Sequence, residues 1–142
     1  MDPKHVLLAF RGRITRKEYW FGVTGTAVVA LAGFAAFYVI LFLTGSIHSD
    51  LILFALALLV LTPVLALWPF LAVHIKRLHD RDRSGWWVLI WNIPLVAWIL
   101  GDSQVGAAAL GGAIGLWTII DLGLGRGTAG PNRFGNDPHV EA

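Results

Sequence analysis

A densely charged stretch, residues 76–87, interrupts an otherwise apolar chain and restricts the folds available to it. Seven of its first eight residues are ionisable, whereas charged residues make up only 14% of the chain. Such a run cannot cross a lipid bilayer, so it lies in water or among the lipid headgroups. Apolar segments of membrane-spanning length flank it, and its side of the membrane therefore determines the side of every other segment.

The composition is that of a membrane protein. Hydrophobic residues make up 56% of the 142 positions, against about 45–50% in soluble domains. The chain contains no cysteine, which excludes disulfides, thiolate chemistry and cysteine-ligated metals. No P-loop, dinucleotide fingerprint or zinc motif is present, so we predict no cofactor and no metal. The length suits one domain, and we expect a single membrane domain over residues 1–142.

Four apolar segments predict an all-α membrane protein with four transmembrane helices. The helices are expected at about residues 20–43, 51–73, 86–100 and 105–124, followed by an irregular cytoplasmic tail over 125–142. The first segment would be about 36 Å long as a helix, enough to cross a hydrocarbon core of ~30 Å.

Prolines predict irregularities in two of these helices. Pro63 and Pro69 imply kinks or a distorted cytoplasmic end in the second segment. The third segment is short, about 22 Å as a helix, and residues 92–94 (Asn-Ile-Pro) interrupt it. The charged stretch between these two segments is expected to be a central loop.

Two features precede the first span. Residues 3–10 predict a short helix lying on the membrane interface, the alternative being a disordered tail with some hydrophobic residues. Thr15 and Glu18 have the spacing of a capping box just before the long apolar run, which favours a capping role for Glu18 over a catalytic one.

The distribution of basic residues predicts the orientation. All eleven Lys and Arg residues precede the first span, lie in the central stretch or follow the fourth span, and the two polar turns contain none. Cytoplasmic loops carry an excess of Lys and Arg, so both termini and the central stretch are predicted to be cytoplasmic. We interpret this clustering as topology and predict no binding to nucleic acid.

Small residues mark possible helix contacts. Gly25, Ala32 and Ala36 could form a packing face on the first span. Small residues recur every four positions in the fourth span, which predicts close contact with another helix, a second copy of the chain or a protein partner: Ala107, Gly111 and Gly115.

Nine ionisable side chains on the predicted cytoplasmic side could form a binding site. Ionisable residues within or beside a span are costly unless paired, which makes them functional candidates. We expect a polar cluster that contacts a protein partner or anionic phospholipid: Arg13, Arg16, Glu18, Arg77, His79, Asp80, Arg83, Asp121 and Arg133.

Asp121 stands about one turn inside the end of the fourth helix. Structural pairing with Arg126, Arg77 or Arg13 is favoured there over a proton or ion site.

The His79–Asp80 pair raises the alternative of a metal site or a histidine–carboxylate base. Adjacent residues on a helix point in different directions, and the further ligands available, His74 and Asp82, have no recognised spacing. We therefore predict no catalytic residue at this pair.

Three motifs carry a family resemblance. Residues 12–20 read GRITRKEYW, residues 76–87 contain KRLHD and SGWW, and residues 132–138 read NRFGNDP. In that order they resemble the G-R-x-[ST]-R-x-E-[FY]-W, R-R-L-H-D…S-G-W-W and N-R-[YF]-G-x-D-P motifs of a bacterial membrane family, domain of unknown function 805 (DUF805). Lys76 replaces an arginine of that pattern, and Asn136 stands where proline is common. The resemblance implies a small multi-pass protein of the bacterial inner membrane. It does not imply any particular activity.

Three functions remain open. The chain could be a structural or regulatory protein that binds a partner or lipid through the polar cluster, which we favour. It could be a small transporter or channel formed by an oligomer, with Pro63, Pro69, Asn92, Pro94 and Asp121 along a path. Four helices in 142 residues leave little room for a pore within one copy. An enzyme acting on lipid headgroups through His79 and Asp80 is the third possibility.

Overall fold

The computed structural model describes residues 3–44, 49–101 and 103–138. Its elements are α1 (Pro3–Leu8), α2 (Arg16–Thr44), α3 (Ser49–Asp80), the 3-10 helix η1 (Gly85–Asn92), α4 (Ile93–Leu100), α5 (Gln104–Thr118) and the π-helix η2 (Ile119–Leu124). Apart from one bridge between Asn132 and Gly135, the described residues form no β structure. The predicted first polar turn, residues 44–50, lies largely outside the described residues, as does the end of the tail, 139–142.

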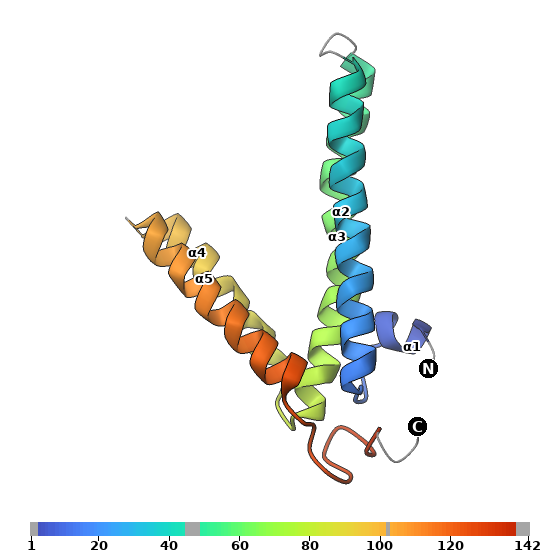
Figure 1. Ribbon diagram of the computed structural model, residues 1–142, viewed down its shortest axis with the longest axis vertical. Coiled ribbons are helices and arrows are strands. Elements are labelled where there is room, and N and C mark those ends of the chain that lie inside the picture. Colours follow the sequence, from blue (N-terminus) through green and yellow to red (C-terminus); the bar gives the residue numbers. More distant parts are fainter. Residues whose placement is uncertain (1–2, 45–48, 102, 139–142) are drawn as a thin grey trace.

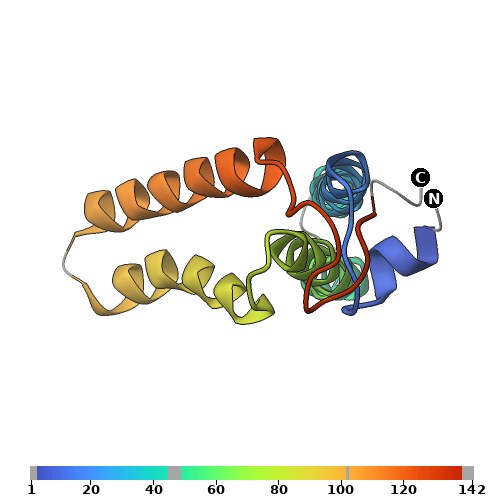
Figure 2. The same ribbon diagram turned by 90° about the horizontal axis from the view of Figure 1, so that it is seen from below.

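The helices form two hairpins that diverge from a common end (Figure 1). The long hairpin pairs α2 with α3, and the other pairs η1 and α4 with α5 and η2. Seen from below, the tail crosses the end of α3 and turns toward α1 (Figure 2). Segments distant in the sequence therefore meet where the hairpins join.

Three helical segments are long and apolar enough to cross a membrane: Arg16–Leu43, Leu51–Asp80 and Gln104–Leu124. A shorter apolar helical segment, Gly85–Leu100, follows the charged stretch. Most large hydrophobic side chains of these segments are exposed, as expected for helices whose surroundings are lipid. The all-helical architecture of the sequence prediction is confirmed.

The buried hydrophobic core lies at the end where the hairpins join. Its six side chains come from α1, the segment before α2, α2 itself, α3 and η2: Val6, Ile14, Tyr19, Val73, Leu78 and Leu122. This core holds together the segments that carry the charged residues.

The α2–α3 hairpin packs through glycines on one face of α2. A Cβ atom at Gly22 would lie 2.4 Å from a methyl group of Val73, and one at Gly33 would lie 2.3 Å from Thr62. These pairs share one antiparallel register. The face predicted through Gly25, Ala32 and Ala36 is not the one that meets α3, because Gly25 and Ala32 are exposed and Gly25 has no neighbour within 4 Å of such a Cβ.

Helix α3 runs further than the sequence predicts. It continues through Pro63 and Pro69 and ends only at Asp80, so Lys76 and Arg77 belong to the helix and not to a loop. The charges mark the end of the apolar surface, whereas backbone hydrogen bonding, which is local, extends the helix by two further turns.

The interruption predicted at residues 92–94 is a change of helix type and not a break, because the segment Gly85–Leu100 is helical throughout. The 3-10 helix η1 begins after Ser84, whose hydroxyl accepts from the Trp86 amide, and ends at Asn92. Pro94 lies in the first turn of α4, where its missing N–H costs no hydrogen bond. A 3-10 helix rises about 2.0 Å per residue, so η1 and α4 together extend to roughly 28 Å.

Part of the small-residue face of α5 is used within the chain. Ala107 is buried, and a Cβ at Gly111 would contact Pro94 of α4 at 3.6 Å. Gly115 has no such neighbour within 4 Å. Contact with a second copy or a partner through this face stays a prediction.

Candidate functional site at the charged end

Two arginines share one buried aspartate where the hairpins join. Nε and Nη2 of Arg13 lie 3.1 and 3.0 Å from Asp80 Oδ1, and Nη1 of Arg77 donates to Asp80 Oδ2. All three side chains are at most 1% exposed. We call these residues the buried ion-pair cluster: Arg13, Arg77 and Asp80.

Backbone carbonyls provide the other acceptors for this cluster. Four of them accept guanidinium N–H groups at 2.5 to 2.7 Å: those of Leu122, Gly125, Thr128 and Gly130. Within the described residues, no buried side-chain nitrogen or oxygen lacks a hydrogen-bond partner. A buried charge is tolerated when such bonds replace its hydration. The cluster thus joins α3, η2, the tail and the segment before α2.

The carbonyl groups at the end of η2 are capped by side chains from other helices. The Trp20 indole donates to the Gly123 carbonyl at 3.2 Å, and Arg16 donates to the Leu124 carbonyl at 3.3 Å. The last carbonyls of a helix have no partner within it and carry a partial negative charge. Arg16 therefore helps to fix the start of α2 against η2.

Asp121 of η2 pairs with the arginines that follow α3. Its Oδ1 lies 2.9 Å from Arg81 Nη2, and its Oδ2 lies 2.7 Å from Arg83 Nη1. The predicted partners Arg126, Arg77 and Arg13 are wrong. The guanidinium groups of the last two point into the buried ion-pair cluster.

His79 and Asp80 point in different directions. The His79 ring stacks on Phe134 of the tail, with centroids 3.9 Å apart and planes 4° apart. Nδ1 of His79 lies 3.3 Å from the Gly12 carbonyl oxygen, and Asn132 donates to the His79 carbonyl. The imidazole and the Asp80 carboxylate are therefore engaged separately.

The remaining predicted residues, Glu18 and Arg133, also have partners within the chain. The Glu18 amide donates to Thr15 Oγ1 at 3.3 Å, and Glu18 Oε2 accepts from the Thr15 amide at 2.9 Å, so the predicted capping box is confirmed. Arg133 pairs with Asp82 at 3.2 Å, and both side chains are exposed.

Lys76 is a structural residue that the sequence reasoning missed. Its side chain is buried, and its ammonium group donates to the carbonyl oxygens of His5 and Val6, the latter at 2.7 Å. Trp68 donates to the Leu8 carbonyl at 3.1 Å. Both donors belong to α3, and together they fasten α1 beside the hairpin (Figure 1). Helix α1 is shorter than the helix predicted over residues 3–10.

The eleven basic residues fall into three groups by exposure. Arg13, Lys76 and Arg77 are buried, and Arg81 and Arg83 are half-buried in the Asp121 pairings. Six are exposed, and we call them the cationic rim: Lys4, Arg11, Arg16, Lys17, Arg126 and Arg133. Fully buried, hydrogen-bonded groups do not contact a ligand, so contacts to other molecules come from the rim and the half-buried pair.

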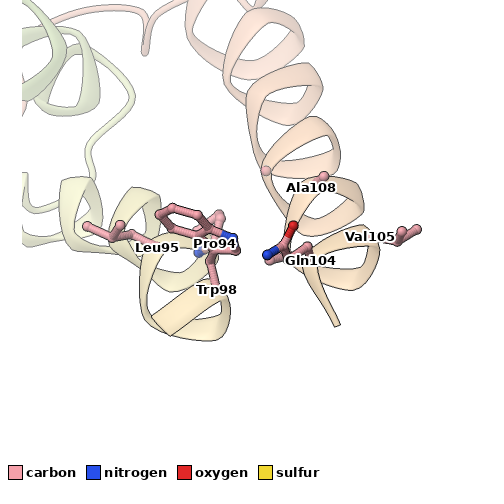
Figure 3. A pocket seen from close by; sticks show the side chains of 8 residues that line it. Pro94, Leu95, Trp98, Gln104, Val105 and Ala108 are labelled. Carbon is pink, nitrogen blue, oxygen red and sulfur yellow. The ribbon is translucent and has the colours of Figure 1, made fainter. Parts of the chain in front are cut away.

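The far end of the second hairpin contains a different kind of cavity, of about 610 Å³. Figure 3 shows Pro94 and Trp98 of α4 facing Gln104 of α5 across it. Its lining residues carry no charge. Among residues 3–44, 49–101 and 103–138, no three His, Asp or Glu side chains are grouped as ligands for a metal ion.

Comparison with known proteins identifies the family. A family model described as "Protein of unknown function (DUF805)" matches residues 7–136. The chain belongs to the DUF805 family. In this DUF805 protein the matched region contains residues 12–20, residues 76–87 and most of the third motif, and it contains the whole buried ion-pair cluster.

Three relatives of this DUF805 protein come from Escherichia coli (strain K12). Inner membrane protein YhaI is 34% identical over 131 residues, covering 92% of this chain and 86% of the relative. Inner membrane protein YhaH is 31% identical over 134 residues, covering 94% and 90%. Uncharacterized protein YiiR is 34% identical over 147 residues, covering 96% and 90%. No solved structure matches the chain.

Proposed function

We propose that this DUF805 protein is a four-span protein of the bacterial inner membrane with both termini in the cytoplasm. The names of the relatives YhaH and YhaI support the location. Three long apolar segments support three spans. The segment Gly85–Leu100 supports a fourth, because its first half is a 3-10 helix and rises more per residue than an α-helix. The basic residues lie on α1, the start of α2, the end of α3 and the tail, which meet at one end of the molecule (Figures 1 and 2). The positive-inside rule favours placing that end in the cytoplasm.

We infer that this end binds the headgroups of anionic phospholipids. The observation that carries the proposal is the division of the basic residues into buried and exposed groups. The three buried ones hold the segments together, and the cationic rim is left to face the headgroup layer. By sequence, this side has eleven Lys and Arg residues against seven Asp and Glu, because Asp50 and Asp102 belong to the opposite turns.

The cationic rim is suited to bind anionic headgroups by electrostatic attraction. Each basic residue near a membrane surface that contains anionic lipid contributes about 1 kcal/mol of attraction, and this attraction falls off within a Debye length. The buried ion-pair cluster keeps the segments bearing the rim in place, so little ordering is needed when a headgroup binds. We propose that the protein senses or organises anionic lipid at the cytoplasmic leaflet.

The experiment compares two lipids that have the same acyl chains but an anionic or a zwitterionic headgroup. The delipidated protein in neutral detergent is titrated with dioleoyl phosphatidylglycerol or dioleoyl phosphatidylcholine, and bound lipids are counted by native mass spectrometry. We expect preferential retention of phosphatidylglycerol and a decline of that preference as salt is raised. Equal retention of both lipids would contradict the proposal.

Two variants, one that removes charge from the rim and one that keeps it, locate the effect. The triple variant Lys17→Gln, Arg126→Gln and Arg133→Gln removes three rim charges that do not belong to the buried ion-pair cluster. It should bind fewer phosphatidylglycerol molecules than the wild type. The control, Arg126→Lys with Arg133→Lys, keeps the charge and should retain the wild-type number.

A further inference from the structure

An apolar groove of about 480 Å³ runs between η1 and α5 and ends at a charged side chain. Arg83 lies at one end of the groove. Aromatic and aliphatic residues form its walls: Trp87, Ile90, Leu110, Ala113 and Trp117. The size lies within the range of small-ligand pockets, about 300–1,000 Å³. The groove lies on a different part of the hairpin from the far-end cavity of Figure 3.

Helix geometry explains why these side chains share one surface. In a 3-10 helix, residues i and i+3 eclipse, which places Trp87 and Ile90 on one face of η1. On α5, Leu110, Ala113 and Trp117 follow one another at three- and four-residue spacing and so face the same way. Asp121 follows Trp117 by four positions, on the π-turn that continues α5. The groove therefore leads from an apolar interior to the Asp121 pairings.

Arg83 is held at the cytoplasmic end of the groove by three partners. Its guanidinium carbon lies 5.6 Å from the ring centroid of Trp87 and 5.7 Å from that of Trp117, and Nη1 lies 2.7 Å from Asp121 Oδ2. Arg81 shares the same carboxylate. Two guanidinium groups thus face one carboxylate, and the triad has one surplus positive charge.

We propose that this groove binds an anionic phospholipid, with one acyl chain along Ile90, Leu110 and Ala113 and the phosphate against Arg83. The proposal rests on the proposed function and names one site for it. Charge complementarity favours this occupant, because the surplus positive charge lies where the groove opens at the charged end. A second copy inserted in the same orientation would bring its own basic end to that position, which like-charge repulsion disfavours.

The titration with the two dioleoyl lipids tests the site through paired variants. Arg83→Gln removes the phosphate contact and is expected to weaken phosphatidylglycerol binding about tenfold, the size of one charge-assisted hydrogen bond. Phosphatidylcholine binding should weaken less, because the choline cation of that lipid offsets the charge of its phosphate. Asp121→Asn keeps a hydrogen-bond acceptor for Arg83 but removes the carboxylate charge that competes with the lipid phosphate for this arginine. It is expected to strengthen phosphatidylglycerol binding. Loss of folding does not raise affinity. A lower affinity of Arg83→Gln together with a higher affinity of Asp121→Asn therefore separates a binding role from a structural one.

A size substitution tests the acyl-chain contact. Ala113→Phe fills the groove and should weaken both lipids at this site. Ala109→Phe, one turn earlier on α5 at an exposed position that does not line the groove, is the control and should bind both lipids as the wild type does.

The outcomes distinguish the site from the broader function. Preference for phosphatidylglycerol that survives both Arg83→Gln and Ala113→Phe, but is lost in the rim variant, would overturn the groove and leave the proposed function standing. Absence of any preference in the wild type would overturn both. A dimer that Ala113→Phe converts to monomer would show that a second copy occupies the groove, which also overturns the inference.

Discussion

Arg13 and Asp80 are 67 residues apart in the sequence, and their side chains form a buried ion pair with Nη2 and Oδ1 3.0 Å apart. Arg77 completes the cluster from one turn earlier on α3, on the other oxygen of the same carboxylate. The pair joins the segment before α2 to the end of α3. Since the cluster is surrounded by protein, its contribution is to the folded state of the charged end.

Asp80→Ala should strongly destabilise the protein. The substitution leaves Arg13 and Arg77 buried without their shared carboxylate, and breaking a buried pair in this way costs about 3–5 kcal/mol. Thermal unfolding in a neutral detergent measures the loss. Asp82→Asn is the control. Its partner Arg133 is 61% exposed, and an exposed pair contributes only ~0–1 kcal/mol. Asparagine, like aspartate, tolerates the positive φ of 54° at this position.

A double-mutant cycle then tests whether the buried residues act as a unit. Arg77→Ala combined with Asp80→Ala should cost less than the sum of the single substitutions, because the second change removes a charge that the first has already stranded. Small single effects that add strictly would contradict a packed cluster.

Thr15→Ala should lower stability by about 1 kcal/mol, since it removes the oxygen that caps the Glu18 amide at the start of α2. Glu18→Gln should be tolerated, because an amide oxygen can still accept from the Thr15 amide. Thr24→Ala is the matched control, as the Thr24 hydroxyl bonds to backbone carbonyls inside α2 and caps nothing. Equal losses from Thr15→Ala and Thr24→Ala in thermal unfolding would contradict the capping role.

Locally determined features of this fold are predictable from the sequence. The capping box needs only Thr15 and Glu18 at the right spacing, and the position of Pro94 in the first turn of α4 coincides with the change of helix type in the third segment. Both depend on backbone groups within a few residues. The prediction of a helix end at residue 73 is wrong, because Lys76 and Arg77 mark only the end of the apolar surface and the helix continues to Asp80.

Features set by partners from distant segments are not predictable in this way. The sequence gathers nine ionisable residues on one side, but Asp121 could meet any of several arginines there. The π-turn and the course of the chain after Asp80 bring Arg81 and Arg83 to it. Likewise, α2 is apolar on all sides, so periodicity does not indicate which face meets α3, and Gly22 replaces Gly25 at the contact.

Gly22→Ala should destabilise the α2–α3 hairpin, and Gly25→Ala should not. A Cβ at Gly22 would lie 2.4 Å from Val73 Cγ2 but 3.4 Å from Val73 Cβ. Val73→Ala in the Gly22→Ala background should therefore recover part of the loss. The Cβ added by Gly25→Ala would have no neighbour within 4 Å. This substitution should raise the stability by up to about 1 kcal/mol through helix propensity. Thermal unfolding of the three variants decides the register, and a Gly22→Ala protein more stable than the wild type would contradict it.

The orientation is tested by single cysteines, which the cysteine-free chain permits without further changes. Ala129→Cys lies at an exposed position in the tail, and Gln104→Cys at an exposed position at the start of α5, at the opposite end of the second hairpin (Figure 1). Gln104 is preferred to Ser103 because the Ser103 hydroxyl caps α5.

If the basic end is cytoplasmic, a membrane-impermeant maleimide applied to spheroplasts should label Gln104→Cys and leave Ala129→Cys unlabelled. Lysis should then expose Ala129→Cys to the reagent, which shows that the tail cysteine is reactive. Labelling of Ala129→Cys in intact spheroplasts would place the cationic rim outside and contradict both the topology and the proposed contact with the cytoplasmic leaflet.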